Sequence, residues 1–170
     1  MATTKEIDVD GGVLVGHDGS DFSDQALRWA LEYASTTGQA VTVVRAWVLT
    51  TAPRPDSWEP GYMPPLEDFA EAVVKRLSAD IAGVVADYPT VDVRTTAVHG
   101  KPATRIIEAS AKVAIIVLGR RGLGGFKGLV LGSVSEQIVR HAQATVVIVQ
   151  PTDIEATPGQ RKVLDADFDE

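Results

Sequence analysis

Short apolar segments alternate along most of the chain with segments of helical periodicity. The apolar segments are rich in valine, isoleucine and threonine, which favour β-strands. Between them, apolar residues recur three or four positions apart, as they do on one face of an α-helix. The alternation predicts the order β-α-β-α-β-α-β-α-β. The expected strands cover residues 13–16, 41–48, 91–98, 113–118 and 145–149, and the expected helices run from about 21 to 37, 66 to 88, 102 to 110 and 133 to 141.

This alternation constrains the fold, because parallel neighbouring strands need a crossover segment between them. It predicts an α/β protein with an open parallel sheet and helices on both faces. In such sheets, ligands bind beyond the carboxyl ends of the strands, at the point where the strand order reverses. Two segments with unusual chemistry follow strand ends: residues 17–21 (His-Asp-Gly-Ser-Asp) and residues 119–132. If the first and fourth strands are neighbours, these segments face each other across a crevice.

The stretch from Gly119 to Ser135 reads GRRGLGGFKGLVLGSVS and holds six of the chain's fifteen glycines. An expected buried strand precedes it, and an expected helix begins at Ser133, directly after Gly132. Glycine lets backbone N–H groups turn toward an anion, and a helix start adds free donors and a positive dipole. The stretch therefore predicts a phosphate-binding loop. The alternative is a turn with no ligand.

The composition excludes several other kinds of site. The chain has 170 residues, enough for one domain with a sizeable core, and 45% of them are hydrophobic. It contains no cysteine, so disulfides, thiolate nucleophiles and cysteine-based metal sites are absent. The three histidines, His17, His99 and His141, match no metal-site spacing. No apolar run reaches the length of a membrane span.

The charge is concentrated in the tail. The net charge is −7, and from Asp153 onward six acidic residues oppose Arg161 and Lys162. The tail therefore carries −4 and the rest of the chain carries −3. Neither part has the basic surface that nucleic acids or membranes attract, so we expect neither as a partner.

These patterns predict three parts. Residues 1–10 form a flexible leader, residues 11–151 a single α/β domain that contains the expected phosphate-binding loop, and residues 152–170 an acidic, disordered tail. The tail is read as a solvated end rather than a partner-binding segment. The first residues have no signal-peptide pattern, so a cytoplasmic location is expected.

Within the domain, residues 51–65 contain five prolines, which forbid regular structure. A loop of this length is either mobile or a lid. Trp58, Tyr62 and Met63 are candidates to cover a ligand, and packing within the loop is the equal alternative.

The spacing Gly119-x2-Gly122-x9-Gly132-Ser133 resembles the nucleotide-binding signature of the universal stress protein family, in its ATP-binding branch. The resemblance covers about residues 11–151. Five further segments are similar to the same family: its first strand and acidic turn (15–20, VGHDGS), its first helix (26–30, ALRWA), its third-strand exit (98–103, VHGKPA), its last helix start (131–135, LGSVS) and its last strand (146–149, VVIV).

The resemblance implies a five-stranded parallel sheet of order 3-2-1-4-5 and a homodimer that forms through the last strand, residues 145–150. It also implies ATP as the ligand. Under the alternative of slow ATP hydrolysis, Asp18 is the candidate ligand for Mg²⁺. The binding residues that it implies are Asp18 after the first strand, Ala46 against adenine, Leu118, Gly119 and Gly122 on the ribose and phosphate side, and Gly132, Ser133, Val134 and Ser135 at the phosphates.

Some positions depart from the family pattern or have a simpler interpretation. Arg120 is basic where the family often has a small or polar residue, and Ala114 replaces a frequent acidic residue. The insert 51–65 leaves the shape of the adenine side open. Asp18 has the alternative role of a turn or capping residue, and His17, with no evident partner, is interpreted as structural or surface. Arg120, Arg121 and Lys127 form either a solvated face or a phosphate contact, and Gly124, Gly125 and Gly128 lie outside the signature.

The leading hypothesis is a regulatory protein of the stress response that senses or buffers ATP and acts as a homodimer. The alternative is an enzyme that slowly hydrolyses ATP or transfers phosphate at the same site. Residues 18–23 (DGSDFS) faintly resemble the pyrophosphate loop of ATP-dependent amidating enzymes, but its paired glycines are missing. A Walker lysine motif and an obvious general base are also missing, so we expect at most weak ATPase activity. A nucleotide-free scaffold would have a broken signature, and this one is intact.

Overall fold

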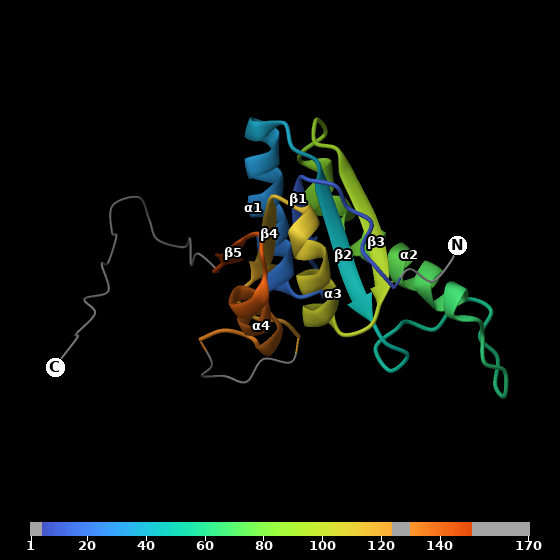
Figure 1. The fold of residues 1–170 in the computed structure, drawn as a ribbon. Coiled ribbons are helices and arrows are strands. Elements are labelled where there is room, and N and C mark those ends of the chain that lie inside the picture. Colours follow the sequence, from blue (N-terminus) through green and yellow to red (C-terminus); the bar gives the residue numbers. More distant parts are fainter. Residues whose placement is uncertain (1–4, 124–129, 151–170) are drawn as a thin grey trace.

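A five-stranded parallel sheet in the order β3-β2-β1-β4-β5 forms the centre of the molecule (Figure 1), which confirms the predicted fold. The computed structural model describes residues 5–123 and 130–150. The strands are β1 (Val13–Gly16), β2 (Val41–Trp47), β3 (Val93–His99), β4 (Ile115–Gly119) and β5 (Thr145–Val149); the helices are α1 (Asp21–Thr37), α2 (Leu66–Ala86), α3 (Pro102–Ala109), the 3₁₀ turn η1 (Ser110–Lys112) and α4 (Ser133–His141).

Every predicted element is present, and the differences lie at element ends. β4 begins at Ile115 rather than at 113, because η1 ends at Lys112 and the pairing with β1 and β5 starts only at Ile115. α2 ends at Ala86 rather than at 88, where the N–H groups of Asp87 and Tyr88 bond the carbonyls three residues back. Such 3₁₀ bonds tighten a last helical turn, and periodicity alone does not register them.

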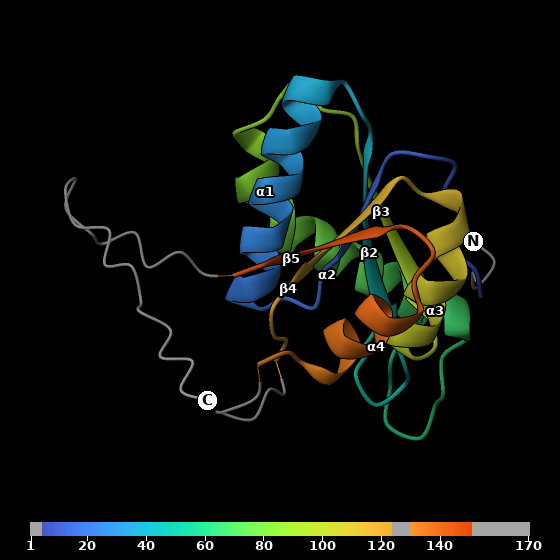
Figure 2. The same cartoon turned by 60° about the vertical axis from the view of Figure 1, so that its left-hand side comes forward.

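The helices cover both faces of the sheet (Figure 2). α1 and α2 pack on one face against alternate residues of β1 and β2, including Val13 and Val43. α3 and α4 pack on the other face, where Leu14 and Ile116 lie beneath Ile106. Because successive strand residues point to opposite faces, each buried strand contributes to both cores. The strand ends are thereby held in fixed register.

α1 starts directly after β1, which places its first turn at the edge of the sheet. The Ser20 side chain accepts a hydrogen bond from the Ser23 N–H at 3.3 Å, so Ser20 is the N-cap. Gly38 closes the helix in the left-handed conformation, and its N–H donates to the Ala34 carbonyl. The turn 17–20 is therefore fixed by the helix that follows it.

The N-terminal segment differs from the expected leader within its described part. Ile7 is only 3% exposed and packs in the core beneath α3, next to the half-buried Val9. Gly11 donates its N–H to the Lys112 carbonyl at 2.7 Å. Two apolar residues in a polar stretch give too weak a pattern to predict this packing. Residues 1–4, like the tail 152–170, lie outside the described residues.

The proline-rich loop 51–65 follows β2, so it leaves the sheet on the side where the carboxyl ends of the strands lie. Arg54 stacks over the Trp58 ring with 4.4 Å between the guanidinium carbon and the ring centroid. Tyr62 and Met63 are exposed. None of the helices in the described ranges is sufficiently long and apolar to cross a membrane.

Candidate functional site

The carboxyl ends of β1 and β4 lie side by side in the sheet. Val13 pairs with Ile115 and Val15 with Val117, so the segments that follow both strands meet at one edge. A cavity of about 880 Å³ opens there. All nine residues that the family resemblance singled out line it: Asp18, Ala46, Leu118, Gly119, Gly122, Gly132, Ser133, Val134 and Ser135.

Asp18 faces the segment that leaves β4. Its Oδ1 accepts hydrogen bonds from the Ser20 N–H at 3.0 Å and the Ser20 hydroxyl at 2.6 Å. Its Oδ2 accepts the Leu123 N–H at 2.9 Å, across 105 residues of sequence. Burial by itself raises the pKa of Asp18, but the hydrogen bonds from Ser20 and Leu123 outweigh burial and lower the pKa below its ordinary value. The carboxylate is therefore ionised at neutral pH.

Gly122 is a glycine because Asp18 lies against it. A Cβ added at this position would overlap Asp18 Oδ2. At Gly119 a Cβ would meet the backbone carbonyl of Phe22 in α1, with the oxygen at 2.6 Å and the carbon at 2.7 Å. The first two signature glycines therefore allow the loop to pass close to both Asp18 and α1.

The two ends of the loop 119–133 are tied together. Gly132 donates its N–H to the Arg120 carbonyl at 2.9 Å, and Arg120 Nε donates to the Val130 carbonyl at 2.6 Å. Arg120 also donates its backbone N–H to Val149 in β5. The Arg120 side chain thus holds the loop, whereas Arg121 lines the cavity. Lys127, Gly124, Gly125 and Gly128 lie outside the described residues.

α4 begins at this cavity without a side-chain cap. Its N-cap is Gly132, and the N–H groups of Ser133, Val134 and Ser135 have no acceptor within the helix. The Ser135 hydroxyl is buried and donates to the Gly119 carbonyl at 3.0 Å. That hydroxyl is therefore committed to the end of β4, which leaves the exposed Ser133 hydroxyl beside the three N–H groups.

The cavity has an apolar wall and a basic rim. Ala46 and Leu118 contribute apolar surface from β2 and β4. The charged residues in its described lining are one acidic residue, Asp18, and four basic ones: Arg45, Arg76, Lys101 and Arg121. The chain as a whole carries −7. A basic cavity on an acidic protein favours an anionic ligand.

The loop 51–65 contributes to the cavity only through its beginning. Thr51, Ala52 and Pro53 are among the lining residues, whereas Trp58, Tyr62 and Met63 are not. In this structure the three large side chains do not cover the cavity.

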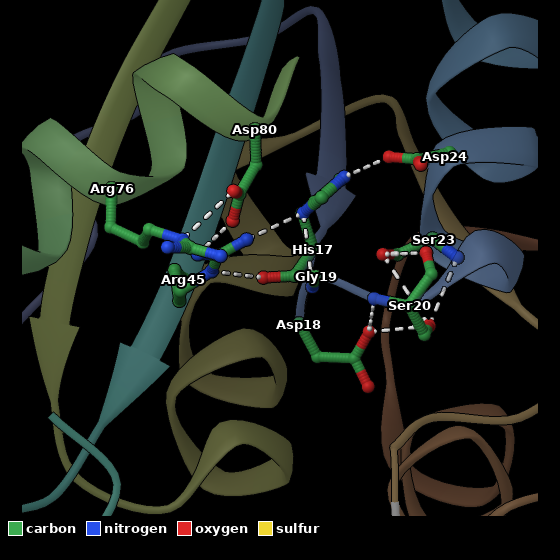
Figure 3. A network of polar contacts seen from close by, with 9 residues as sticks. All are labelled: His17, Asp18, Gly19, Ser20, Ser23, Asp24, Arg45, Arg76 and Asp80. Atoms are coloured by element: carbon green, nitrogen blue, oxygen red, sulfur yellow. Dashed lines mark hydrogen bonds and ion pairs between the residues drawn. The ribbon is translucent and has the colours of Figure 1, made fainter. Parts of the chain in front are cut away.

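A polar network around the buried His17 adjoins the cavity between α1 and α2 (Figure 3). His17 is 3% exposed, and its Nε2 lies 2.9 Å from Asp24 Oδ1. Arg45 contacts His17 and also donates to Asp80 Oδ2 at 2.8 Å. Arg76 pairs with the other Asp80 oxygen at 2.9 Å. Burial lowers the pKa of His17, and the hydrogen bond to Asp24 offsets this only in part, so the ring is neutral at pH 7.

Sequence reasoning found Asp18 but missed this network. His17 is a structural histidine with three partners rather than one without a partner. Two signals were present in the sequence: Arg45 is a charged residue within an apolar strand, and Asp80 stands three residues from Leu77 on the inward stripe of α2. A charged side chain that is removed from water needs a partner, so an ion pair between Arg45 and Asp80 could have been inferred from these two signals.

Asp18 is the candidate metal ligand, and its environment fits Mg²⁺ in one respect. A carboxylate has about four lone-pair positions, of which the donors from Ser20 and Leu123 occupy three. One position on Oδ2 remains. Across residues 5–123 and 130–150, no three histidine or acidic side chains gather to hold a metal ion. A magnesium ion here would therefore be held by one carboxylate together with ligand phosphates and water.

The fold and the cavity together define an α/β protein with a cavity at the topological switch point of its sheet, where open α/β sheets bind ligands. A model of the universal stress protein family matches residues 12–150. The chain belongs to this family.

Universal stress protein Rv1996 of Mycobacterium tuberculosis (strain ATCC 25618 / H37Rv) is 35% identical over 149 residues, which are 86% of this chain and 46% of that protein. The chain thus spans about half the length of this relative. Among solved structures, UspA from Lactobacillus plantarum aligns with a TM-score of 0.61 and 22% identity, covering 85% of this chain and 99% of that one. A universal stress protein in complex with cAMP aligns with a TM-score of 0.57 and 23% identity, covering 85% and 98%. These similarities show the fold.

Proposed function

We propose that this protein binds ATP or a related adenine nucleotide in the 880 Å³ cavity and acts as a nucleotide-dependent regulator in the stress response. One observation carries the proposal: the signature glycines, Asp18 and the uncapped start of α4 line the same cavity. The family match supports it, and so does the solved relative in complex with cAMP.

The phosphates are assigned to the start of α4. The N–H groups of Ser133, Val134 and Ser135 point out of the helix end, and the helix dipole adds positive potential. The Ser133 hydroxyl and Arg121 supply further donors at the same end of the cavity. This combination matches the charge and geometry of a phosphate chain.

The base and sugar are assigned to the apolar wall. Ala46 stands at the end of β2, and Leu118 and Gly119 close β4. A flat aromatic base gains from contact with such a wall because its faces are poorly hydrated. Asp18 lines the same cavity, and its remaining lone-pair position on Oδ2 would hold Mg²⁺ at the phosphates. The bound ion would neutralise phosphate charge.

The test is to denature the purified protein, identify any released nucleotide, and measure thermal unfolding with ATP, ADP, AMP and cAMP. At ATP concentrations near 100 times Kd, binding adds about 2.7 kcal/mol to the free energy of unfolding. Gly122→Glu places a charged side chain against Asp18 and should abolish the shift. Gly83→Glu makes the same chemical change at an open position in α2 and should retain it. No released nucleotide and no shift with any of the four compounds would end the proposal.

The alternative function, slow ATP hydrolysis or phosphate transfer, uses the same cavity. The structure offers it little support among the described residues. The lowered pKa of Asp18 makes it a poor base near pH 7, and the free nitrogen of His17 already accepts from Arg45. Release of several phosphates per second that is lost in Asp18→Ala would favour the enzyme.

We further propose a cytoplasmic homodimer that pairs through residues 145–150. Among the described residues, β5 is an edge strand of the sheet and pairs with β4 on one side only. An unpaired strand edge is a template for a second chain. Light scattering at micromolar concentration should give twice the chain mass of 18.1 kDa, and a monomeric mass would exclude this part of the proposal.

A further inference from the structure

We propose that Arg45 is a positioning residue of the nucleotide site: it fixes the turn between β1 and α1 and thereby aims the Asp18 carboxylate at the loop that follows β4. The inference rests on the proposed function for its ligand. Its structural part, the fixing of residues 17–20, holds without any nucleotide.

All three side-chain nitrogens of Arg45 have a hydrogen-bond acceptor. Nε donates to the His17 carbonyl at 3.1 Å, and Nη2 lies 2.8 Å from His17 Nδ1. Nη1 donates to Asp80 Oδ2 at 2.8 Å. The side chain is 13% exposed, so these contacts are largely shielded from water. Arg45 therefore forms hydrogen bonds with both the backbone carbonyl and the ring of His17, the residue that precedes Asp18 (Figure 3).

The contacts also fix the tautomer of His17. An arginine has donors only, and the Gly19 N–H is a second donor to the same Nδ1, at 3.3 Å. Nδ1 must therefore carry the lone pair, and the proton sits on Nε2, which donates to Asp24 Oδ1 at 2.9 Å. The imidazole is thus a fixed link from β2 to the first turn of α1.

The link continues to the site. Asp18 is bonded to the carbonyl group that Arg45 holds, and its Oδ2 accepts the Leu123 N–H. The turn between them is short and contains Gly19 in the left-handed region, with φ of 91°. Within the turn, the Ser20 N–H and hydroxyl hold Asp18 Oδ1. The Arg45 contacts hold His17, and thereby the turn as a whole, against β2, which sets the direction in which Asp18 leaves the turn.

α2 holds the other side of Arg45. Asp80 accepts from Arg45 through Oδ2 and from Arg76 through Oδ1. The carboxylate thus orients the guanidinium toward His17. The β1–α1 turn is consequently fixed against α2, an element that contributes little else to the phosphate side of the cavity.

The alternative is that Arg45, which lines the cavity, acts only as a positive charge on the ligand. Lysine distinguishes the two roles. It keeps the charge but has a single nitrogen, and it cannot hold two atoms of His17 and Asp80 at once. Positioning predicts that Arg45→Lys fails like Arg45→Met; a pure charge effect predicts that Arg45→Lys binds as wild type does.

The experiment measures ATP affinity by calorimetry and amide hydrogen exchange of the free protein for wild type, Arg45→Lys, Arg45→Met and the control Arg28→Lys. Arg28 forms an exposed pair with Asp87 away from the cavity. Both Arg45 variants should weaken ATP binding about tenfold or more and speed exchange in residues 17–23, with exchange in the last turns of α1 unchanged. Wild-type affinity and exchange in Arg45→Lys would overturn the inference.

A second pair of variants keeps the proposal testable if the Arg45 variants fold poorly. Asparagine at position 17 places an acceptor near the place of Nδ1, whereas glutamine places a donor near that of Nε2. His17→Asn should bind ATP better than His17→Gln, because it preserves the acceptor for Arg45; the reverse order would overturn the inference. If wild type binds no nucleotide, the proposed function fails, and hydrogen exchange of residues 17–23 alone still decides the role of Arg45.

Discussion

Gly122→Ala gives the most direct test of the contact between the two halves of the cavity. The added Cβ would overlap Asp18 Oδ2, the oxygen that accepts the Leu123 N–H. Relief requires either the carboxylate or the loop to move. Either movement breaks the 2.9 Å hydrogen bond between the Leu123 N–H and Asp18 Oδ2.

The size of the effect follows from the bond that is lost. A hydrogen bond to a charged group contributes about 1.5–3 kcal/mol. Leu123 is exposed, so the loop is able to move outward without unfolding the domain. If nucleotide binding needs the loop in its original place, the cost is added to the binding free energy. One factor of ten corresponds to about 1.4 kcal/mol, so Kd should rise about 10- to 150-fold.

The assay is ATP calorimetry together with urea unfolding of Gly122→Ala, with Gly83→Ala as the matched control. Gly83 lies within α2, and a Cβ there meets no atom within 4 Å. Alanine should stabilise that helix by about 0.5–1 kcal/mol and leave the affinity unchanged. If Gly122→Ala bound ATP with a Kd within about a factor of two of wild type, the reasoning from the Asp18 contact would be refuted.

Three further predictions concern stability. Gly119→Ala should lower the free energy of unfolding by about 1–3 kcal/mol in urea, because its Cβ meets the rigid Phe22 backbone; an unchanged value would contradict the packing. Ile7→Ala should cost about 2 kcal/mol by the same assay, and a cost near zero would mean that the segment does not pack. The pKa of His17 is lowered from 6.5, so the unfolded state binds more protons, and stability should fall as pH falls below about 6.5, by at most about 1.4 kcal/mol per unit. Urea unfolding between pH 7 and 5 should show a smaller fall in His17→Asn; an equal fall would assign the effect to other groups.

The fold could be predicted because its information is local and repeated. Each strand is short and apolar, each helix has its own stripe, and alternation leaves few arrangements. The strand order was different: it came from resemblance, since no local pattern states which strands pair. The element ends were predicted less well, as at the end of α2, where the N–H groups of Asp87 and Tyr88 bond the carbonyls three residues back.

The candidate site residues came from the family resemblance, which rests in part on the fixed spacing of Gly119, Gly122 and Gly132 within one stretch of sequence. The His17–Arg45–Asp80 network draws on three elements separated by up to 63 positions. Local spacing does not show that an arginine in β2 contacts the residue that follows β1. Only the pairing of β1 with β2 makes that contact possible.

Asp18 was predicted with two alternative roles, a turn residue or a ligand, and the structure makes them compatible. If the cavity binds phosphates as proposed, a negative charge within it is unfavourable unless donors or a cation offset it. Here the Ser20 and Leu123 donors offset much of it and hold the loop in place. These bonds also lower the pKa of Asp18, which keeps the remaining lone pair available for a cation at neutral pH. The turn contacts are therefore what would make Asp18 a good magnesium ligand, and the glycine at 122 is what allows the loop to approach closely enough to form them.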